Sequence, residues 1–436
     1  MKKLKIVLYT VALLMLVSSC QFRNREWRDF LNQQYNNGDT DGFYVTSTND
    51  VDLEKHFPDD CYLPDGTPVK EYKGEVTGNV HTMTSSTSVT AVIQSLIGWG
   101  GNNKLVELSG IYYSYENPSA GNYDKVVLSG KVIMPANGKF KRYILVSHYT
   151  IGSNAEAPSN CFSLEGILAN MGYCVIIPDY MGYGITADRV HPYLIMESTA
   201  HHVLSMFFAV RNTFERNGLK PEHDDIYLMG YSQGGATSMA VEYLIESAYS
   251  EQVKIKRVFA GGGPYDVKAT YDRFVETNEA SYPVAVPLVI QGMIAGDPTL
   301  DINLKDLLQP RIYENIDEWV NSKQYSTGKV NQLINTRKTD EILLPLGMDQ
   351  QSKAVCNLYK ALDANSIVKR HWCPKAPVYM MHSIDDETVP YDANSIAAQS
   401  AWVNANIQYN LGHYGGHVMT CLQFIFAVQK LLKDEE

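Results

Sequence analysis

The hydrophobic and polar positions of residues 105–263 follow two alternating periods. Apolar runs of about four to eight residues are typical of buried strands, whereas apolar positions that repeat every three or four residues predict helices covering them. Val106–Glu116 and Lys125–Met134 alternate in the pattern of two antiparallel strands, with turn-forming residues between them. This part of the chain therefore begins with a predicted strand pair.

Strands and helices then alternate along the chain. Predicted strands cover Tyr143–Ser147, Tyr173–Asp179, the run that begins at Ile226, and Val258–Ala260. Predicted helices cover Ser163–Met171, Tyr193–Arg216 and a stretch after Ser232 that reaches about Ala248. Because a strand–helix–strand connection joins parallel strands, this order predicts an α/β fold with a mainly parallel sheet and helices on both faces.

The alternation is interrupted between residues 264 and 374, where helical patterns, prolines and loops predominate. It then resumes with two predicted strands, each followed by a predicted helix. The strands are Val378–His382 and Ile407–Leu411, and the helices are Asp392–Asn404 and Val418–Leu432. We therefore predict a core formed by residues 105–263 and 375–436. Residues 264–374 form a helical insertion that we expect to project over the sheet as a cap.

The N-terminal residues have the pattern of an export signal. A basic start is followed by a short apolar stretch and by Val17-Ser18-Ser19-Cys20, which resembles a bacterial lipobox. We expect residues 1–19 to be a lipoprotein signal peptide and Cys20 to carry the lipid, so that the membrane is a partner and the protein lies at the periplasmic face or cell surface of the envelope. A plain secretory signal or an uncleaved anchor helix would be the alternatives.

Two segments separate this signal from the predicted core. Residues 20–44 are polar and are predicted to be a tether, and residues 45–104 form an extension to which the sequence assigns no role. The extension could pack on the core or form a small cap of its own.

Composition narrows the class of protein. The chain has 436 residues, of which 45% are hydrophobic and 19% charged, as expected for a globular protein. Its formal net charge of −11, without an internal lysine or arginine block, argues against nucleic acid as a partner. The six cysteines after Cys20 permit disulfides in an exported protein, but none has a metal-site spacing, and we expect no metal or organic cofactor.

The sequence Gly230-x-Ser232-x-Gly234 has the pattern of a nucleophile elbow. An apolar run precedes it and small residues that can begin a helix follow it, which is the context that the motif requires. In such a turn the serine hydroxyl projects above the sheet, next to the N–H groups of a helix N-terminus. We therefore predict Ser232 to be a nucleophile.

A serine nucleophile needs a histidine base and a carboxylate that orients this base. Asp386 follows the strand that ends near His382, and Asp385 is the competing candidate. His417 lies after the last predicted strand, at the start of the last helix, and His413 competes with it. The preceding Gly415-Gly416 pair favours His417, because glycines let the loop reach the serine. We predict Ser232, Asp386 and His417 as the catalytic residues.

Two backbone N–H groups are candidates to bind the oxyanion of the reaction. One belongs to Gln233, the residue after the nucleophile, and the other to the segment His148-Tyr149-Thr150 after the strand Tyr143–Ser147. Within that segment Tyr149 is the preferred candidate, and its side chain could also narrow an acyl pocket.

These motifs together resemble the α/β-hydrolases, and among them the secretory lipases and esterases. The resemblance covers residues 105–433 and rests on the elbow, the Asp386 and His417 loops, and three further segments: His148–Ser153, Pro178–Gly184 and His191–Tyr193. It implies an α/β-hydrolase fold and a serine hydrolase that cleaves small-molecule or lipid carboxylic esters. Asp-x-x-Val-Pro is frequent in the acid loop of such enzymes, which favours Asp386.

Other functions are compatible with the same motifs. A serine peptidase of the aminopeptidase or dipeptidyl type would need carboxylates to hold a substrate amine, for which Glu276, Glu279 and Glu314 are candidates. A binding protein on this fold would have no use for the three catalytic residues. An acyltransferase would differ only in preferring an acceptor alcohol to water.

Overall fold

The computed structural model describes residues 40–71, 75–76, 87–88, 95–98, 101 and 103–435. The predicted signal peptide, Cys20 and residues 20–39 of the predicted tether lie outside the described residues.

A nine-stranded sheet forms the centre of the molecule, with the order β1-β4-β5-β7-β6-β8-β9-β10-β11. Its strands are β1 (Tyr44–Val51), β4 (Leu105–Asn117), β5 (Asn122–Pro135), β6 (Tyr143–Ser147), β7 (Cys174–Pro178), β8 (Ile226–Tyr231), β9 (Ile255–Gly261), β10 (Val378–Ser383) and β11 (Ile407–Gly412). A separate pair consists of β2 (Glu75–Val76) and β3 (Thr87–Ser88).

The sheet is antiparallel at one side and parallel over the rest. β1, β4, β5 and β7 pair antiparallel in that order, and all pairs from β7 to β11 are parallel. The predicted α/β class with a mainly parallel sheet after an antiparallel start is confirmed. β1 was not predicted, because its residues Tyr44–Val51 are mostly polar and exposed.

The segment Tyr44–Val51 corrects the predicted end of the tether. Phe43 and Tyr44 are buried, and the Phe43 N–H donates to the hydroxyl of Thr213, 2.8 Å away. The chain is thus attached to the core before residue 44. The start of the predicted extension is the outermost strand of the sheet.

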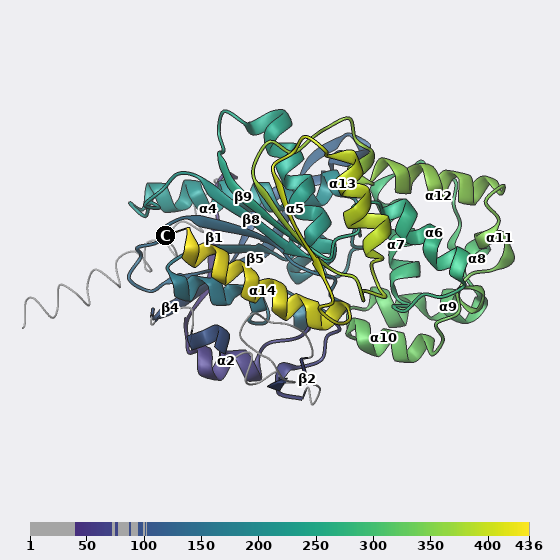
Figure 1. Ribbon diagram of the computed structural model, residues 1–436, viewed down its shortest axis with the longest axis horizontal. Coiled ribbons are helices and arrows are strands. Elements are labelled where there is room, and N and C mark those ends of the chain that lie inside the picture. The colour runs from purple at the N-terminus through teal and green to yellow at the C-terminus, as the bar shows by residue number, and fades with distance from the viewer. Residues whose placement is uncertain are drawn as a thin grey trace, which may run out of the picture.

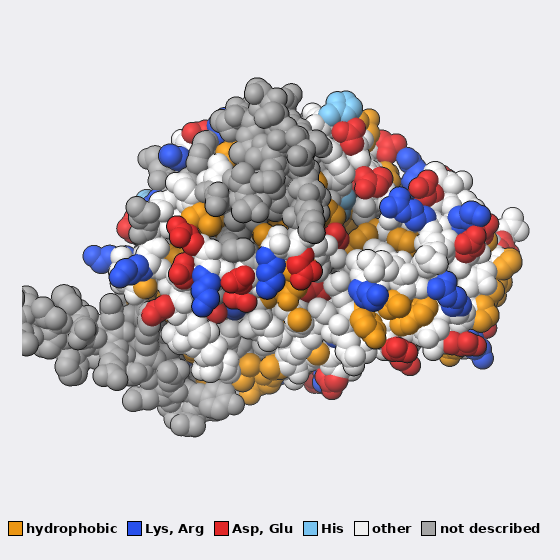
Figure 2. Space-filling model, turned by 90° about the horizontal axis from the view of Figure 1, so that it is seen from below, with side chains coloured by type: hydrophobic (Ala, Val, Ile, Leu, Met, Phe, Trp, Pro, Cys, Tyr) orange, Lys and Arg blue, Asp and Glu red, His pale blue; other side chains and the backbone are white. Residues whose placement is uncertain are grey.

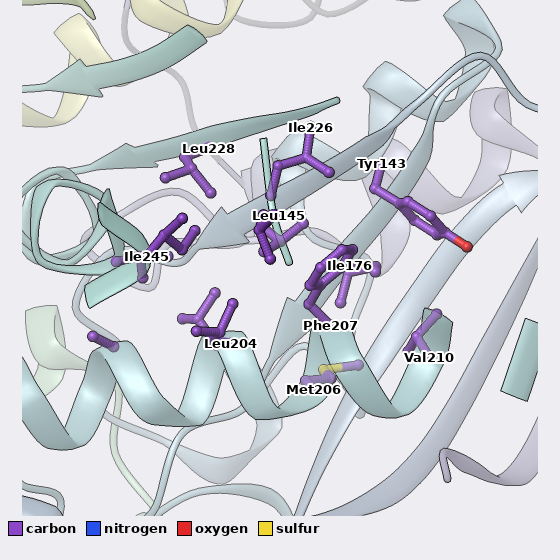
Figure 3. Close-up of a cluster of buried hydrophobic side chains, with 14 of the residues drawn as sticks. Tyr143, Leu145, Ile176, Leu204, Met206, Phe207, Val210, Ile226, Leu228 and Ile245 are labelled. Carbon is purple, nitrogen blue, oxygen red and sulfur yellow. The ribbon is translucent and has the colours of Figure 1, made fainter. Parts of the chain in front are cut away.

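Helices cover both faces of the sheet, because its strands present alternate residues to opposite sides. α4 (Met196–Arg216) and α5 (Gln233–Leu244) pack on one face, and α14 (His417–Asp434) and the 3₁₀ helix Leu164–Met171 pack on the other (Figure 1). Figure 3 shows Leu145 and Leu228 of the sheet facing Leu204 of α4. The neighbouring strand residues Ile144 and Val146 belong to the opposite apolar cluster.

The insertion between β9 and β10 forms a helical body of its own at one end of the sheet, drawn in green in Figure 1. Its helices are α6 (Val267–Thr277), α7 (Ala285–Gly296), α8 (Leu304–Leu307), α9 (Pro310–Ile316), α10 (Thr327–Ile334), α11 (Pro345–Met348) and α12 (Lys353–Ala364). They enclose a third apolar cluster, to which Tyr193–Ile195 of the core also belong. We call residues 264–374 the cap.

The extension before the core contacts both the core and the cap. It contains α2 (Leu53–Asp59), followed by a loop that we call the wedge, residues 60–71. The Phe162 N–H of the core donates to the Asp60 carbonyl at 3.0 Å, and the Gly328 N–H of the cap donates to the Asp65 carbonyl at 2.9 Å. The wedge therefore links the two bodies.

Acidic and basic side chains are interspersed on the face of the molecule shown in Figure 2. Within the described part of the chain, no helix combines the length and apolar character needed to cross a membrane. The six cysteines that the structure describes are free thiols, including the buried Cys61, Cys161, Cys174 and Cys421.

Glu165 is an unusual member of the apolar layer beneath the sheet. Its side chain is 1% exposed, and among the described residues neither carboxyl oxygen has a hydrogen-bond partner on another residue. Burial disfavours the charged form and raises the pKa of Glu165 from about 4.5 to about 7. Folding is therefore favoured when this group is protonated.

This burial predicts a specific pH dependence of stability. Between pH 4.5 and 7 the folded chain retains the Glu165 proton that the unfolded chain releases, so the contribution of this group to stability falls by roughly 3 kcal/mol as the pH rises. The E165Q variant cannot titrate, and its stability relative to wild type should increase from pH 4.5 to pH 8. Urea unfolding of both proteins at several pH values measures the difference, and a constant difference would contradict the prediction.

Candidate active site

Ser232 lies in a strained turn between β8 and α5. Its φ is 58° and its ψ is −125°, a conformation that non-glycine residues adopt only where the surrounding structure imposes it. A side chain at position 230 would approach the Gly234 carbonyl oxygen to 2.1 Å, and one at position 234 would approach the Ser147 carbonyl oxygen to 1.9 Å. The glycines of the motif are therefore required by backbone contacts on both sides of Ser232.

The structure brings Ser232, His417 and Asp386 into one hydrogen-bonded chain. His417 Nε2 lies 2.8 Å from Ser232 Oγ, and His417 Nδ1 lies 2.6 Å from Asp386 Oδ2. All three residues are buried, although they come from three different connections at the carboxyl edge of the parallel strands. The distances are those expected of a nucleophile, a base and a carboxylate that orients the base.

The surroundings of Asp386 keep its carboxylate charged. The Thr388 and Val389 N–H groups donate to Oδ1 at 2.9 and 2.8 Å. Burial acts to raise the pKa of Asp386, but the charge of His417 and hydrogen bonds from His382 and His417 outweigh it and hold the pKa well below its usual range. A charged Asp386 stabilises the Nδ1–H tautomer of His417, which leaves Nε2 free to accept the serine proton.

The two competing candidates, Asp385 and His413, pair with each other instead. His413 Nδ1 lies 2.7 Å from Asp385 Oδ1, and both side chains are exposed to solvent. In the part of the chain that the structure describes, neither of them forms a hydrogen bond or ion pair with Ser232. The structure thus separates a buried Asp–His pair from an exposed one in the same two loops.

The predicted oxyanion donors lie on backbone segments that touch each other. Gln233 begins α5, and the close approach of Gly234 to the Ser147 and His148 carbonyls brings this helix end against the loop that contains Tyr149. In the described part of the chain, neither the Gln233 N–H nor the Tyr149 N–H has a hydrogen-bond acceptor. Both groups are therefore available to a substrate, and their role stays a prediction.

His191 has a positioning role that the sequence motif did not reveal. Its Nδ1 lies 2.8 Å from the Met181 carbonyl oxygen, so it carries the proton, and its Nε2 accepts from the Gln233 side-chain amide at 2.7 Å. Burial, and then the nearby charge of Lys323, lower the pKa of His191 well below its ordinary value, in agreement with a neutral ring. His191 thus orients Gln233, the residue that follows the predicted nucleophile and whose backbone N–H is a predicted oxyanion donor.

Tyr231 contacts His417, the predicted base, through both its hydroxyl group and its ring. Its hydroxyl donates to the His417 carbonyl oxygen at 2.7 Å, and its ring lies against the imidazole with a centroid distance of 5.1 Å. The residue before the nucleophile therefore fixes the backbone of the predicted base. Because tyrosine is a common residue in this chain, the sequence alone did not indicate this role of Tyr231.

An apolar cavity of about 50 Å³ opens above Ser232 and His417. Cap residues form much of its wall, chiefly Val267, Tyr271 and Phe274 of α6 and Val289 of α7. Tyr149 also lines the cavity, and its predicted effect on an acyl group stays a prediction.

The wedge completes this cavity. Pro64 lines it, and hydrogen bonds from the Tyr149 hydroxyl to the Tyr62 carbonyl (2.8 Å) and from the Tyr282 hydroxyl to the Pro64 carbonyl (3.3 Å) hold the wedge in place. The segment to which the sequence assigned no role therefore borders the site.

The acidic candidates for binding a substrate amine lie elsewhere. Glu276, Glu279 and Glu314 are exposed, and none of them lines the cavity. Among the described residues that line it, Asp and Glu are absent.

Comparison with solved structures identifies the fold. The rice cell wall degrading esterase LipA from Xanthomonas oryzae superposes with a TM-score of 0.66 at 17% identity, covering 91% of this chain and 99% of the esterase. Candida antarctica lipase A gives a TM-score of 0.53 at 18% identity, covering 74% of each chain. The predicted α/β-hydrolase fold is confirmed.

Sequence comparison identifies the family. A sequence model of the secretory lipases matches residues 156–424, and the chain belongs to this family. The secreted triacylglycerol lipase LIP5 of Malassezia globosa is 24% identical over 347 residues, which make up 70% of this chain and 65% of the lipase. The chain thus spans just under two thirds of the length of this relative.

The two Asp–His pairs provide a matched test of the site. D386N preserves the shape of the buried carboxylate but removes the charge that orients His417, and we expect it to reduce kcat for ester hydrolysis by about 10⁴-fold. D385N makes the same chemical change in the exposed pair and should leave kcat within about twofold. Hydrolysis of p-nitrophenyl butyrate by both variants measures the effect; a comparable loss in D385N would contradict the assignment.

Proposed function

We propose that this protein is an exported serine hydrolase that cleaves carboxylic esters through an acyl-enzyme on Ser232. The observation that carries the proposal is the hydrogen-bonded chain from Asp386 through His417 to Ser232 at the base of an apolar cavity. Membership of the secretory lipase family supports the same chemistry.

The reaction follows from the positions of these groups. His417 Nε2 takes the proton of Ser232 Oγ as the oxygen attacks the ester carbonyl carbon. The Gln233 and Tyr149 N–H groups stabilise the negative charge that develops on the carbonyl oxygen. His417 then protonates the leaving alcohol.

Deacylation uses the same groups. Water takes the place of the alcohol, His417 accepts one of its protons, and the resulting hydroxide attacks the acyl-enzyme. Collapse of the second tetrahedral intermediate releases the carboxylic acid and returns the proton to Ser232. The residues of this chain supply every proton transfer, and we propose no cofactor.

The apolar cavity favours ester cleavage over the peptidase alternative. A peptidase of the aminopeptidase type must neutralise a substrate ammonium group, and burying that charge without a carboxylate partner is costly. Since Glu276, Glu279 and Glu314 are exposed and away from the cavity, they give this alternative no support. A binding protein would not need the charged, oriented Asp–His pair.

The nucleophile is tested by S232A, with S247A as a matched control. Ser247 is exposed in the π-helix Ile245–Tyr249 that follows α5. We expect S232A to lose labelling by a fluorophosphonate probe and about 10⁴- to 10⁶-fold in kcat, because members of such a catalytic unit do not act independently. The S247A protein should retain both. Full ester hydrolysis by a folded S232A protein would refute the proposal.

We also propose that Cys20 anchors the protein to the bacterial cell envelope through a lipid. The basic and apolar sequence before Cys20 supports this proposal, and the name of the secreted relative from Malassezia globosa supports export in general.

The anchor is tested by growing expressing cells with a radioactive fatty acid. The wild-type protein should become labelled and C20A should not, since the acyl chain is attached at Cys20. C356A is the control, because it removes an exposed thiol from the folded part of the chain. Label that persists in C20A would contradict the lipid anchor.

A further inference from the structure

Two compartments of opposite character adjoin beside Ser232 and His417. The first is the apolar cavity already described, whose farther walls are cap helices α6 and α7. The second is a polar groove of about 740 Å³ between the wedge and the cap. Tyr282, Thr388 and Val418 line both, so the two spaces adjoin next to Ser232 and His417, which themselves line the cavity.

The cavity is small for a lipid chain. About 50 Å³ is room for roughly three to five water-sized groups, at about 10–15 Å³ for each. Three carbons beyond the carbonyl of a butyryl group fill this space, whereas the seven of an octanoyl group exceed it. Val289 and Phe274 are buried in the cap, so a longer chain would have to displace packed side chains.

The groove has the opposite chemistry. Hydroxyl, amide and charged side chains from three distant segments line it: Asp65 and Glu71 of the wedge, Gln332 and Arg337 of the cap, and Glu387 next to Asp386. Both signs of charge are present, so the groove does not select a simple anion or cation. In the described part of the chain, the side chains of Gln332, Arg337 and Glu71 make no hydrogen bond or ion pair to other residues.

The position of His417 decides which part of the substrate each compartment receives. His417 must protonate the leaving oxygen, so the alcohol departs on the side of the base. His417 itself lines the cavity, and the groove begins at the residues next to it: Val418, which follows the base, and Glu387 and Thr388, which follow the carboxylate. The alcohol therefore leaves toward the groove, and the acyl chain extends into the cavity.

We propose that the substrate is an ester of a short acyl chain, about four carbons long, with a polar alcohol that carries several hydroxyl groups. This inference rests on the proposed ester hydrolase function and adds the class of both halves of the substrate. The cavity between α6 and α7 selects the acyl length, and the groove between the wedge and α10 selects the alcohol. Residues 60–71 of the wedge precede the segment that matches the secretory lipase family, residues 156–424. The wall of the alcohol site formed by Asp65–Pro68 and Glu71 is therefore built outside that segment.

Four esters test the two selections separately. Glyceryl butyrate, glyceryl octanoate, propyl butyrate and propyl octanoate combine two acyl lengths with two three-carbon alcohols that differ only in hydroxyl groups. We expect kcat/KM for glyceryl butyrate to exceed that for glyceryl octanoate by at least about tenfold, because an unaccommodated methylene costs that much. It should exceed that for propyl butyrate by about fivefold, the effect of one net hydrogen bond.

Two pairs of variants assign each selection to its compartment. V289A enlarges the cavity and should raise the octanoate/butyrate ratio several-fold, whereas V355A makes the same change in the cap interior away from the cavity. Q332L removes hydrogen bonding from the groove and should lower the glyceryl/propyl ratio without changing the acyl ratio. Q351L is its control on an exposed part of the cap outside both compartments.

Ratios of kcat/KM within one protein do not depend on the fraction that is correctly folded. Equal or greater rates for octanoate esters would overturn the acyl assignment, and equal or greater rates for propyl esters would overturn the alcohol assignment. Changes of the same size in V355A or Q351L would overturn the role of the compartment concerned. S232A serves as the separate control: if it hydrolyses the four esters like wild type, the proposed function fails, and if it hydrolyses none while wild type shows no selection, only this inference fails.

Discussion

The contact between the backbone of Gly234 and the carbonyls of Ser147 and His148 is the constraint on which the site depends. A side chain at position 234 would lie 1.9 Å from the Ser147 oxygen, so only glycine allows α5 to begin so close to β6. The contact holds Ser232 in its strained conformation and brings the Gln233 N–H beside the Tyr149 loop. The predicted nucleophile and oxyanion donors are therefore positioned by one packing arrangement rather than by independent features.

The parallel sheet extends this arrangement to the other catalytic groups. The β8, β10 and β11 strands end at the same edge, and the loops that follow them contain Ser232, Asp386 and His417. Buried hydrogen bonds from the Tyr231 hydroxyl to the His417 carbonyl and from the Gln233 side chain to His191 then reduce the freedom of the site. Such supporting contacts keep the reacting atoms at hydrogen-bonding distance before any substrate arrives.

The cap and the wedge determine what can reach these atoms. Apolar cap helices close the space above the serine, and the wedge closes it from another direction through hydrogen bonds with Tyr149, Tyr282 and Gly328. The result is a small apolar space beside a larger polar one. The residues proposed to cleave the ester lie in the core, and the residues proposed to select it lie in segments added to the core.

The sequence by itself determined most of the core. Apolar runs and helical periods reflect burial against a sheet, so they predicted the parallel strands and α4, α5 and α14 near their observed bounds. The elbow glycines reflect the steric requirement of a tight turn, and the serine requires a histidine base and a carboxylate. Ser232, Asp386 and His417 could therefore be selected without a structure.

Only the tertiary structure showed that Asp386 and His417 form a buried pair and that Asp385 and His413 form an exposed one, because local sequence does not encode which side of a loop faces the serine. It also showed that β1 belongs to the sheet and that the wedge borders the active site. The polar β1 is held by backbone pairing with β4, and the wedge is held by hydrogen bonds to residues more than two hundred positions away. Interactions of this kind leave no periodic pattern in the chain, and folding alone brings their partners together.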